Sequence, residues 1–164
     1  MNPDSEQRAR VALSFLAKPG DTVLGAALRI RTATDVLGLV TGADPDGEAL
    51  LAGEPEDATL SRAVQRWRDR LGEVPSTARL AAWRESGMRL VIPGDAEWPT
   101  QLDDLGDARP LVLWVRGGAD LRLSCVNSVA IVGSRAATGY GNHVAIELAA
   151  ALGERGVATV SGGA

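Results

Sequence analysis

Apolar residues in the first part of the chain recur with a helical period. In the clearest example, Leu60, Val64, Trp67 and Leu71 lie on one face of a helix. The pattern predicts helices over residues 5–17, 22–31 and 34–40, a longer helix that begins at Thr59 or Ser61, and a short one from Pro75 to Gly87. Turn or loop sequence is predicted at Asp44–Gly47 and at Gly53–Asp57.

After Gly87 the apolar residues form short continuous runs, which are typical of buried strands. Strands are predicted over residues 88–92, 111–115, 129–132 and 157–160, and helices over 98–105 and 139–155. The last two strands and the long helix between them form a βαβ unit with parallel strands. The sequence therefore predicts an α/β chain with a helical domain over 1–75, a lead-in segment over 76–127 and the first βαβ unit of a Rossmann-like domain over 128–164.

Composition adds limits on compartment and partners. The chain has 164 residues, of which 45% are apolar and 23% charged, as is usual for a soluble globular protein. No apolar run is long enough to span a bilayer, the acidic N-terminus does not resemble a secretory signal, and the one cysteine, Cys125, cannot form an internal disulfide. We therefore expect a cytoplasmic protein that does not bind membranes.

The net charge of −4 disfavours nucleic-acid binding through bulk positive charge but leaves room for a local basic groove. All basic residues except Lys18 are arginines, a bias that suits phosphate contacts and that a GC-rich genome would also produce. On the helix after Thr59, the face opposite the apolar stripe carries Arg62, Arg66, Arg68 and Arg70. We interpret it as a solvated face, with a nucleic-acid contact as the alternative.

The segment from Ser128 to Gly141 carries the candidate chemistry. A buried strand ends at Gly133, and a short polar loop then leads into the long helix. In parallel sheets such loops form the ligand crevice, and the helix directs its first unsatisfied N–H groups at the same place. Gly133 allows close approach of backbone N–H groups, Ser134 offers a hydroxyl and Arg135 can grip a phosphate with two N–H groups. The second strand ends in a similar loop, Ser161-Gly162-Gly163.

These loops predict an anion or phosphate site, with a tight βα turn and a solvated Arg135 as the alternative. The dinucleotide fingerprint is absent because Gly133 is followed by Ser-Arg-Ala-Ala, and no Gly-Lys-Ser/Thr of a P-loop follows. The pattern thus argues against an NAD enzyme or an NTPase that uses this loop. We predict no catalytic residues, no metal site and no cofactor, because His143 is the only histidine and the carboxylates are scattered.

The same residues resemble a known family. The run Val129-Ala-Ile-Val-Gly-Ser-Arg135, the pair Tyr140-Gly141 and the run Gly156-Val-Ala-Thr-Val-Ser-Gly-Gly-Ala164 are similar to the DNA-processing protein A family, also called DprA or Smf. The upstream runs Pro93–Leu102 and Pro110–Gly117 are similar to the lead-in of that family. The front, with Leu16–Asp21, resembles its N-terminal helical domain, which is SAM-like or helix-hairpin-helix-like.

The resemblance implies a non-enzymatic protein that binds single-stranded DNA and helps to load the RecA recombinase in DNA uptake and recombination (natural transformation). It implies that Gly133, Ser134 and Arg135 contact DNA phosphates, together with Ser161, Gly162 and Gly163. It also implies a homodimer for the full-length protein. In the family the sequence continues beyond this stretch, so we expect the chain to be a front fragment whose Rossmann-like domain is incomplete.

Two other functions remain as alternatives. One is an enzyme of the Rossmann-like group that cleaves ribose 5-phosphate from nucleoside monophosphates, although its Pro-Gly-Gly-x-Gly-Thr motif is absent from this chain. The other is a fragment without binding activity of its own. Because one helix and a few strands cannot cover both faces of a parallel sheet, we expect residues 129–160 to be poorly ordered in the isolated chain while the helical front stays folded.

Overall fold

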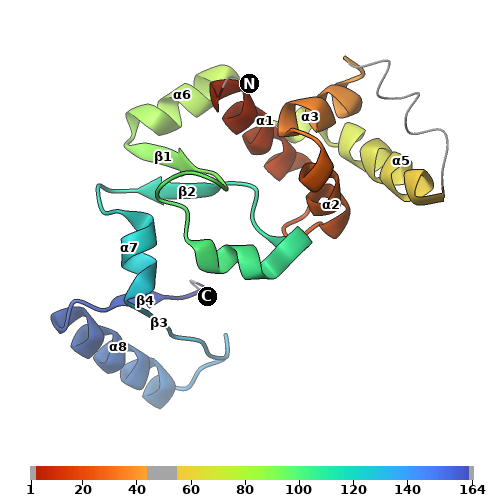
Figure 1. Ribbon diagram of the computed structural model, residues 1–164. Coiled ribbons are helices and arrows are strands. Elements are labelled where there is room, and N and C mark those ends of the chain that lie inside the picture. Colours follow the sequence, from red (N-terminus) through yellow and green to blue (C-terminus); the bar gives the residue numbers. More distant parts are fainter. Residues whose placement is uncertain (1–2, 44–54, 163–164) are drawn as a thin grey trace. The chain divides into compact units, whose positions relative to one another are not determined.

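The computed structural model describes residues 3–43 and 55–162 (Figure 1). The chain forms two compact units, Met1–Gly117 and Gly118–Ala164, and each is described here by itself. The structure is rich in helix and contains two small sheets in its described part, which is consistent with the predicted α/β class. The SAM-like and Rossmann-like assignments and the domain boundaries at residues 75 and 127 stay predictions; in the structure, the helical front and the strands of residues 88–116 belong to one unit.

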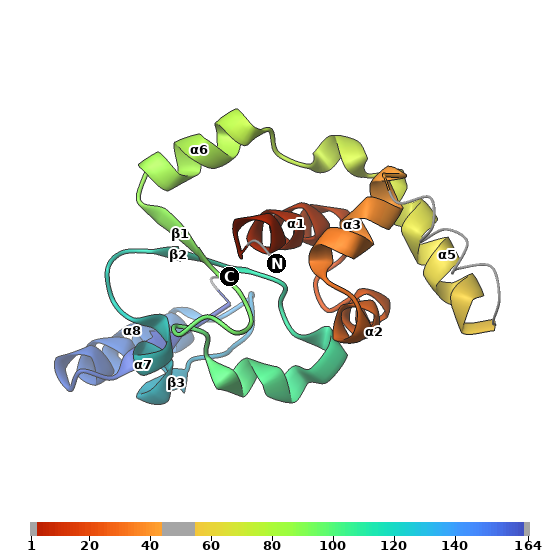
Figure 2. The same ribbon diagram turned by 45° about the horizontal axis from the view of Figure 1, so that its top comes forward.

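The first unit consists mainly of helices around one antiparallel strand pair (Figures 1 and 2). Its elements are α1 (Pro3–Leu16), α2 (Thr22–Ile30), α3 (Ala33–Thr41), α5 (Pro55–Arg68), η1 (Leu71–Glu73), α6 (Thr77–Glu85), β1 (Met88–Val91), η2 (Thr100–Ala108) and β2 (Leu113–Arg116). In the strand pair, Met88 lies opposite Arg116 and Val91 opposite Leu113. None of the helices in the described part of the chain is long and apolar enough to cross a membrane.

The core of this unit lies between α1, α2, α3 and α5. Its largest fully buried side chains are Trp67, Leu13, Leu16, Leu24 and Leu39. Burial of such side chains stabilises a fold by about 1.5–3 kcal/mol each. The apolar stripe predicted for residues 60–71 is confirmed at its centre, where Val64 and Trp67 are buried. Leu71, at the end of the stripe, lies beyond the helix and is 38% exposed.

Some element boundaries differ from the prediction. Helix α5 begins at Pro55, ahead of Thr59, because proline is well suited to the first helical position. Residues 55–57 of the loop predicted at Gly53–Asp57 are therefore helical, and residues 53–54 lie outside the described part. Helix α6 begins at Thr77 because the side chain of Ser76 caps it by accepting a hydrogen bond from the N–H of Arg79. The helix predicted over 98–105 is a 3₁₀ segment shifted to Thr100–Ala108. The turn predicted at Asp44–Gly47 lies outside the described residues.

Two arginines of the predicted basic face, Arg68 at the end of α5 and Arg70 just after it, have a structural role that neither interpretation of that face included. The guanidinium of Arg68 donates hydrogen bonds to the carbonyls of Leu39 (2.7 Å) and Val40 (3.1 Å) near the end of α3. Arg70 donates to the carbonyl of Leu16 at the end of α1 (2.8 Å). These carbonyls have no partner within their own helix, so both arginines act as C-terminal caps. Arg62 and Arg66 are exposed.

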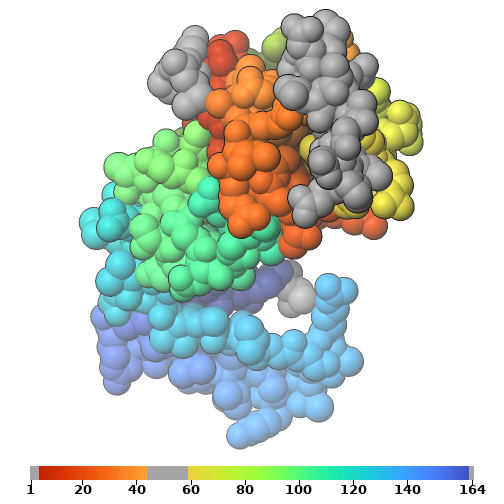
Figure 3. Space-filling view, turned by 45° about the vertical axis from the view of Figure 1, so that its right-hand side comes forward, coloured from red at the N-terminus to blue at the C-terminus, as the bar shows by residue number. Residues whose placement is uncertain are grey.

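Helix α2 approaches η2 so closely that only glycine fits at the contact. A Cβ atom on Gly25 would lie 1.9 Å from the carbonyl oxygen of Asp107, far inside van der Waals distance. Figure 3 shows α2 and α3 (red to orange) meeting the η2 region (green) on the surface of this unit. An ion pair between Arg29 and Asp107 (3.2 Å) lies at the same contact.

We therefore expect Gly25→Ala to destabilise the first unit although alanine favours helices. The clash costs about 1–3 kcal/mol or more, which exceeds the gain of about 1 kcal/mol in helix propensity. Urea unfolding followed by tryptophan fluorescence measures the difference. Gly153→Ala, in a helix where a Cβ meets open space, serves as the control and leaves this transition unchanged. A Gly25→Ala protein as stable as the wild type would show that η2 does not pack on α2 this closely.

The second unit contains α7 (Leu121–Val126), β3 (Ser128–Ala130), α8 (Gly139–Glu154) and β4 (Ala158–Val160). Strands β3 and β4 pair in parallel, as predicted, with Ser128 opposite Ala158 and Ala130 opposite Val160. Both strands are shorter than predicted, and the short helix α7 was not predicted. In the described part of this unit no residue is buried, so it has no hydrophobic core of its own.

Candidate nucleic-acid interface

The loops that follow β3 and β4 lie at the same edge of the small sheet. This arrangement results from the parallel register, which brings the carboxyl ends of both strands together. The pairing continues one residue past β3, where the N–H of Ile131 donates to the carbonyl of Val160 (2.8 Å). The residues after Val160 therefore begin beside Ile131 and Val132, directly ahead of Gly133.

The loop between β3 and α8 is held by its own side chains. The hydroxyl of Ser134 accepts a hydrogen bond from the N–H of Ala136 (3.1 Å), which forms a tight turn. The hydroxyl of Thr138 caps α8 by accepting from the N–H of Gly141 (3.2 Å). Ser134 is thus engaged in shaping the loop, and its hydroxyl hydrogen can still point outward to a ligand oxygen.

Thr138 is a residue whose role the sequence analysis missed. The sequence does contain a signal for this role, since a threonine directly before the first helical residue is a common N-cap. The cap fixes where α8 begins and hence where its first N–H groups and the positive end of its dipole point. Gly139 and Tyr140 supply the first of these N–H groups, and the side chain of Tyr140 is exposed.

The predicted phosphate-binding residues in this loop are all exposed. Gly133, Ser134 and Arg135 lie on the surface between Val132 and the start of α8. A Cβ on Gly133 would meet open space, and its φ angle lies outside the left-handed region, so the described chain does not itself require glycine there. A glycine that the fold does not need is consistent with close approach of another molecule to the backbone.

The second loop is described only in part. Ser161 and Gly162 follow β4 and are exposed, and a Cβ on Gly162 would also meet open space. Gly163 lies outside the described residues. The structure therefore brings five of the six predicted residues to loops at one sheet edge: Gly133, Ser134, Arg135, Ser161 and Gly162. Their role in binding stays a prediction.

Groups for metal or acid–base chemistry do not gather near these loops. Over the described ranges, no three histidine, cysteine, aspartate or glutamate side chains lie close enough together to hold a metal ion. His143 is exposed on α8, and Cys125 is a half-buried free thiol in α7. The chemistry available at this edge is that of backbone N–H groups, hydroxyls and one guanidinium, which together suit an anion.

Comparison with known proteins shows which proteins these loops are similar to. The family model of DNA recombination-mediator protein A matches residues 89–164, a stretch that runs from β1 to the loop after β4. Two proteins of Mycobacterium tuberculosis named as DNA processing protein DprA, from strains CDC 1551 / Oshkosh and ATCC 25618 / H37Rv, are each 37% identical over 172 aligned residues. The alignment covers 98% of this chain.

The resemblance to the DNA-processing protein A family is thus supported both by the family model and by these relatives. The chain spans about 40% of the length of these DprA relatives. No solved structure is significantly similar to it. The match of the DprA family model includes both candidate loops, and the resemblance stated for Val129–Arg135 and Gly156–Ala164 is confirmed at the level of the family.

Proposed function

We propose that this protein binds single-stranded DNA through the loops after β3 and β4 and acts in DNA recombination. The observation that carries the proposal is the parallel pairing of β3 and β4, which brings two exposed glycine-containing loops and Arg135 to one sheet edge at the N-terminus of α8. The match of residues 89–164 to the family model of DNA recombination-mediator protein A supports it. Gly133, Ser134, Arg135, Ser161, Gly162 and Gly163 are the proposed phosphate-contacting residues.

The chemistry of this edge favours a phosphate chain. Backbone N–H groups at a helix N-terminus attract anions, and the guanidinium of Arg135 can donate two parallel hydrogen bonds to one phosphate. Such contacts carry no information about bases, so binding of this kind is independent of sequence and depends on salt. The protein's net charge of −4 means that attraction has to be local to the loops.

Arg135→Ala in the full-length protein tests the site. We expect affinity for single-stranded oligonucleotides to fall by about 1–3 kcal/mol, equally for different sequences, because one charge-assisted phosphate contact is lost. The slope of log affinity against log salt concentration becomes shallower by roughly 0.7, the contribution of one phosphate contact on a single strand. Fluorescence anisotropy titrations at several salt concentrations measure both quantities.

Arg122→Ala is the matched control, because Arg122 is an exposed arginine of α7 in the same unit. It keeps the affinity and the salt slope of the wild type. Equal affinities for the Arg135→Ala variant and the wild type would show that this loop is not part of the DNA-binding site, even if the protein binds DNA through other residues.

The remaining parts of the proposal rest on the family resemblance. We expect the full-length protein to be a cytoplasmic homodimer that works without catalysis and loads RecA onto the bound strand. RecA nucleation on a single strand coated with single-strand-binding protein, with and without the full-length protein, tests this partner. Unchanged nucleation with intact DNA binding would reject RecA loading and leave the loop site standing.

A further inference from the structure

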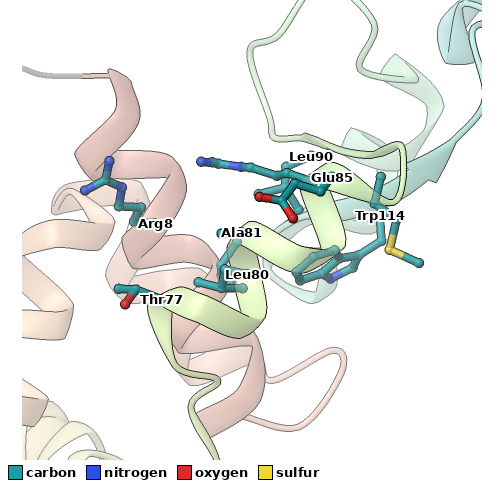
Figure 4. A pocket seen from close by; sticks show the side chains of 10 residues that line it. Arg8, Thr77, Leu80, Ala81, Glu85, Leu90 and Trp114 are labelled. Carbon is teal, nitrogen blue, oxygen red and sulfur yellow. The ribbon is translucent and has the colours of Figure 1, made fainter.

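A pocket of about 400 Å³ lies within the first unit, whereas the DNA-binding loops proposed above belong to the second. Its walls come from α1, α6, β1 and β2 (Figure 4). The lining is mainly apolar and includes Val11, Leu80, Ala81, Met88, Leu90 and Trp114. Its volume lies in the range of about 300–1,000 Å³ that is usual for ligand sites, and an apolar lining with a few polar groups is also usual there.

Trp114 forms a rigid wall at one end of the pocket. Its ring packs edge-on against the ring of Trp83 (5.0 Å between centroids), and Trp83 stacks on Phe15 (6.3 Å). The guanidinium of Arg79 lies 5.1 Å from the centre of the Trp83 ring. These ring contacts hold the indole of Trp114 in place although it is 36% exposed. Its exposed surface can therefore pack against an apolar group of a bound molecule.

The opposite end of the pocket carries the charged side chains, two arginines beside the carboxylates of Asp4 and Glu85. Figure 4 shows Arg8 of α1 at the end away from Trp114. Arg84 of α6 reaches the same region, because its guanidinium donates to the side chain of Gln7 (3.2 Å) and lies 3.9 Å from the carboxylate of Asp4. Asp4 also pairs with Arg8, so two arginines from different helices converge on one carboxylate.

This triad shows how the pocket would hold a carboxylate from another molecule. The side chains are largely in solvent, with exposed fractions of 65% for Arg8, 48% for Arg84 and 46% for Asp4. Exposed ion pairs contribute at most about 1 kcal/mol, so exchanging Asp4 for an external carboxylate costs little. The two guanidinium groups are donors that suit carboxylates in particular.

We propose that this pocket binds a short acidic peptide segment of a partner protein, with an apolar anchor residue against Trp114 and Leu80 and a carboxylate on Arg8 and Arg84. The apolar wall and the two arginines lie at opposite ends of the pocket, so the apolar anchor and the acidic residue of the peptide would occupy opposite ends as well. An apolar anchor in a pocket with charged residues at the rim is a common mode of peptide recognition.

The rim argues for a peptide over a nucleic acid. Asp4 and Glu85 place two carboxylates beside the arginines, and a chain of phosphates would meet both. A peptide can place one carboxylate between the arginines and keep its other residues clear of Glu85.

The test uses a fluorescein-labelled acidic peptide that carries a single phenylalanine between aspartates, titrated into the full-length protein. We expect saturable binding that weakens as salt rises, and no binding of peptides in which serine replaces phenylalanine or lysine replaces aspartate. Ala81→Leu, which fills the pocket, should weaken binding by about tenfold or more. Ala82→Leu is its matched control, because Ala82 is exposed on the same helix and does not line the pocket.

Arg84→Glu should weaken binding by about tenfold because it replaces an attraction with a repulsion, whereas Arg122→Glu in the second unit should not. Absence of saturable binding to the wild type would overturn the proposal, as would equal losses for Ala81→Leu and Ala82→Leu. Displacement of the peptide by a single-stranded oligonucleotide, with Arg84→Glu losing affinity for that oligonucleotide, would assign the pocket to nucleic acid and also overturn it.

Discussion

In hydrogen exchange of the 164-residue chain, amides in the core of the first unit exchange at least about a thousandfold more slowly than those of β3, α8 and β4. Amides of α1, α3 and α5 around Leu13, Leu39 and Trp67 open only when the unit unfolds, and an unfolding free energy of about 5 kcal/mol gives protection of that order. Amides over 129–160 exchange at rates close to those of an unfolded peptide. Mass spectrometry of peptic fragments resolves the two regions.

The reason for the difference is burial. Fully buried side chains hold the first unit together, whereas the second unit exposes most of its large apolar residues. Ile146 is 66% exposed and Leu148 47%, although both lie in α8, the helix of the βαβ unit. Two strands of three residues and one helix remove little apolar surface from water, and both edges of the strand pair are open.

The first unit is an internal control, because both regions are measured in the same sample. A titration with oligonucleotide extends the test, since a ligand that binds only the folded form stabilises it. Slow, cooperative exchange across β3, α8 and β4 without ligand would contradict the prediction and would mean that this small unit is stable alone.

Much of the fold was predictable because it depends on local signals. Period, caps and turn residues placed α1, α2 and α3 within a few residues, and the apolar runs placed all four strands. The convergence of Gly133 and Ser161 on one sheet edge also followed from the sequence, because a strand, a helix and a strand of these lengths make a parallel pair.

The features that the sequence did not predict depend on contacts between distant residues. The capping of α3 by Arg68 joins residues that are 28 positions apart in the sequence. The sequence of α5 by itself does not distinguish this arginine from one that only contacts solvent. The close approach of Gly25 to Asp107 and the pocket beside Trp114 arise only when elements pack. Helix α7, at six residues, is too short to show a period.

A further contact between distant residues lies at Glu6. This carboxylate is 8% exposed and accepts two hydrogen bonds, one from Nε of Arg10 (2.9 Å) and one from the N–H of Ala33 (2.9 Å). Ala33 is the first residue of α3, so Glu6 satisfies an N–H group that has no partner within the helix and places negative charge at the positive end of its dipole. One side chain thus fixes α3 to α1.

Glu6→Ala should lower the free energy of unfolding of the first unit by about 3–5 kcal/mol, because it leaves the guanidinium of Arg10 buried without its partner and the N–H of Ala33 unsatisfied. Glu6→Gln should cost less, since its amide oxygen still accepts one of the two hydrogen bonds. Urea unfolding followed by circular dichroism at a helical wavelength gives both values.

Asp4→Ala is the matched control, because Asp4 and Arg8 form the same i, i+4 pair on the same helix but at the surface. Its cost should stay below about 1 kcal/mol. Both pairs join a carboxylate to an arginine four residues later, so the difference between their unfolding free energies reports the effect of burial and not of charge alone. If Glu6→Ala cost no more than Asp4→Ala, α1 and α3 would have to be held by their apolar contacts alone, and the carboxylate would have no structural role.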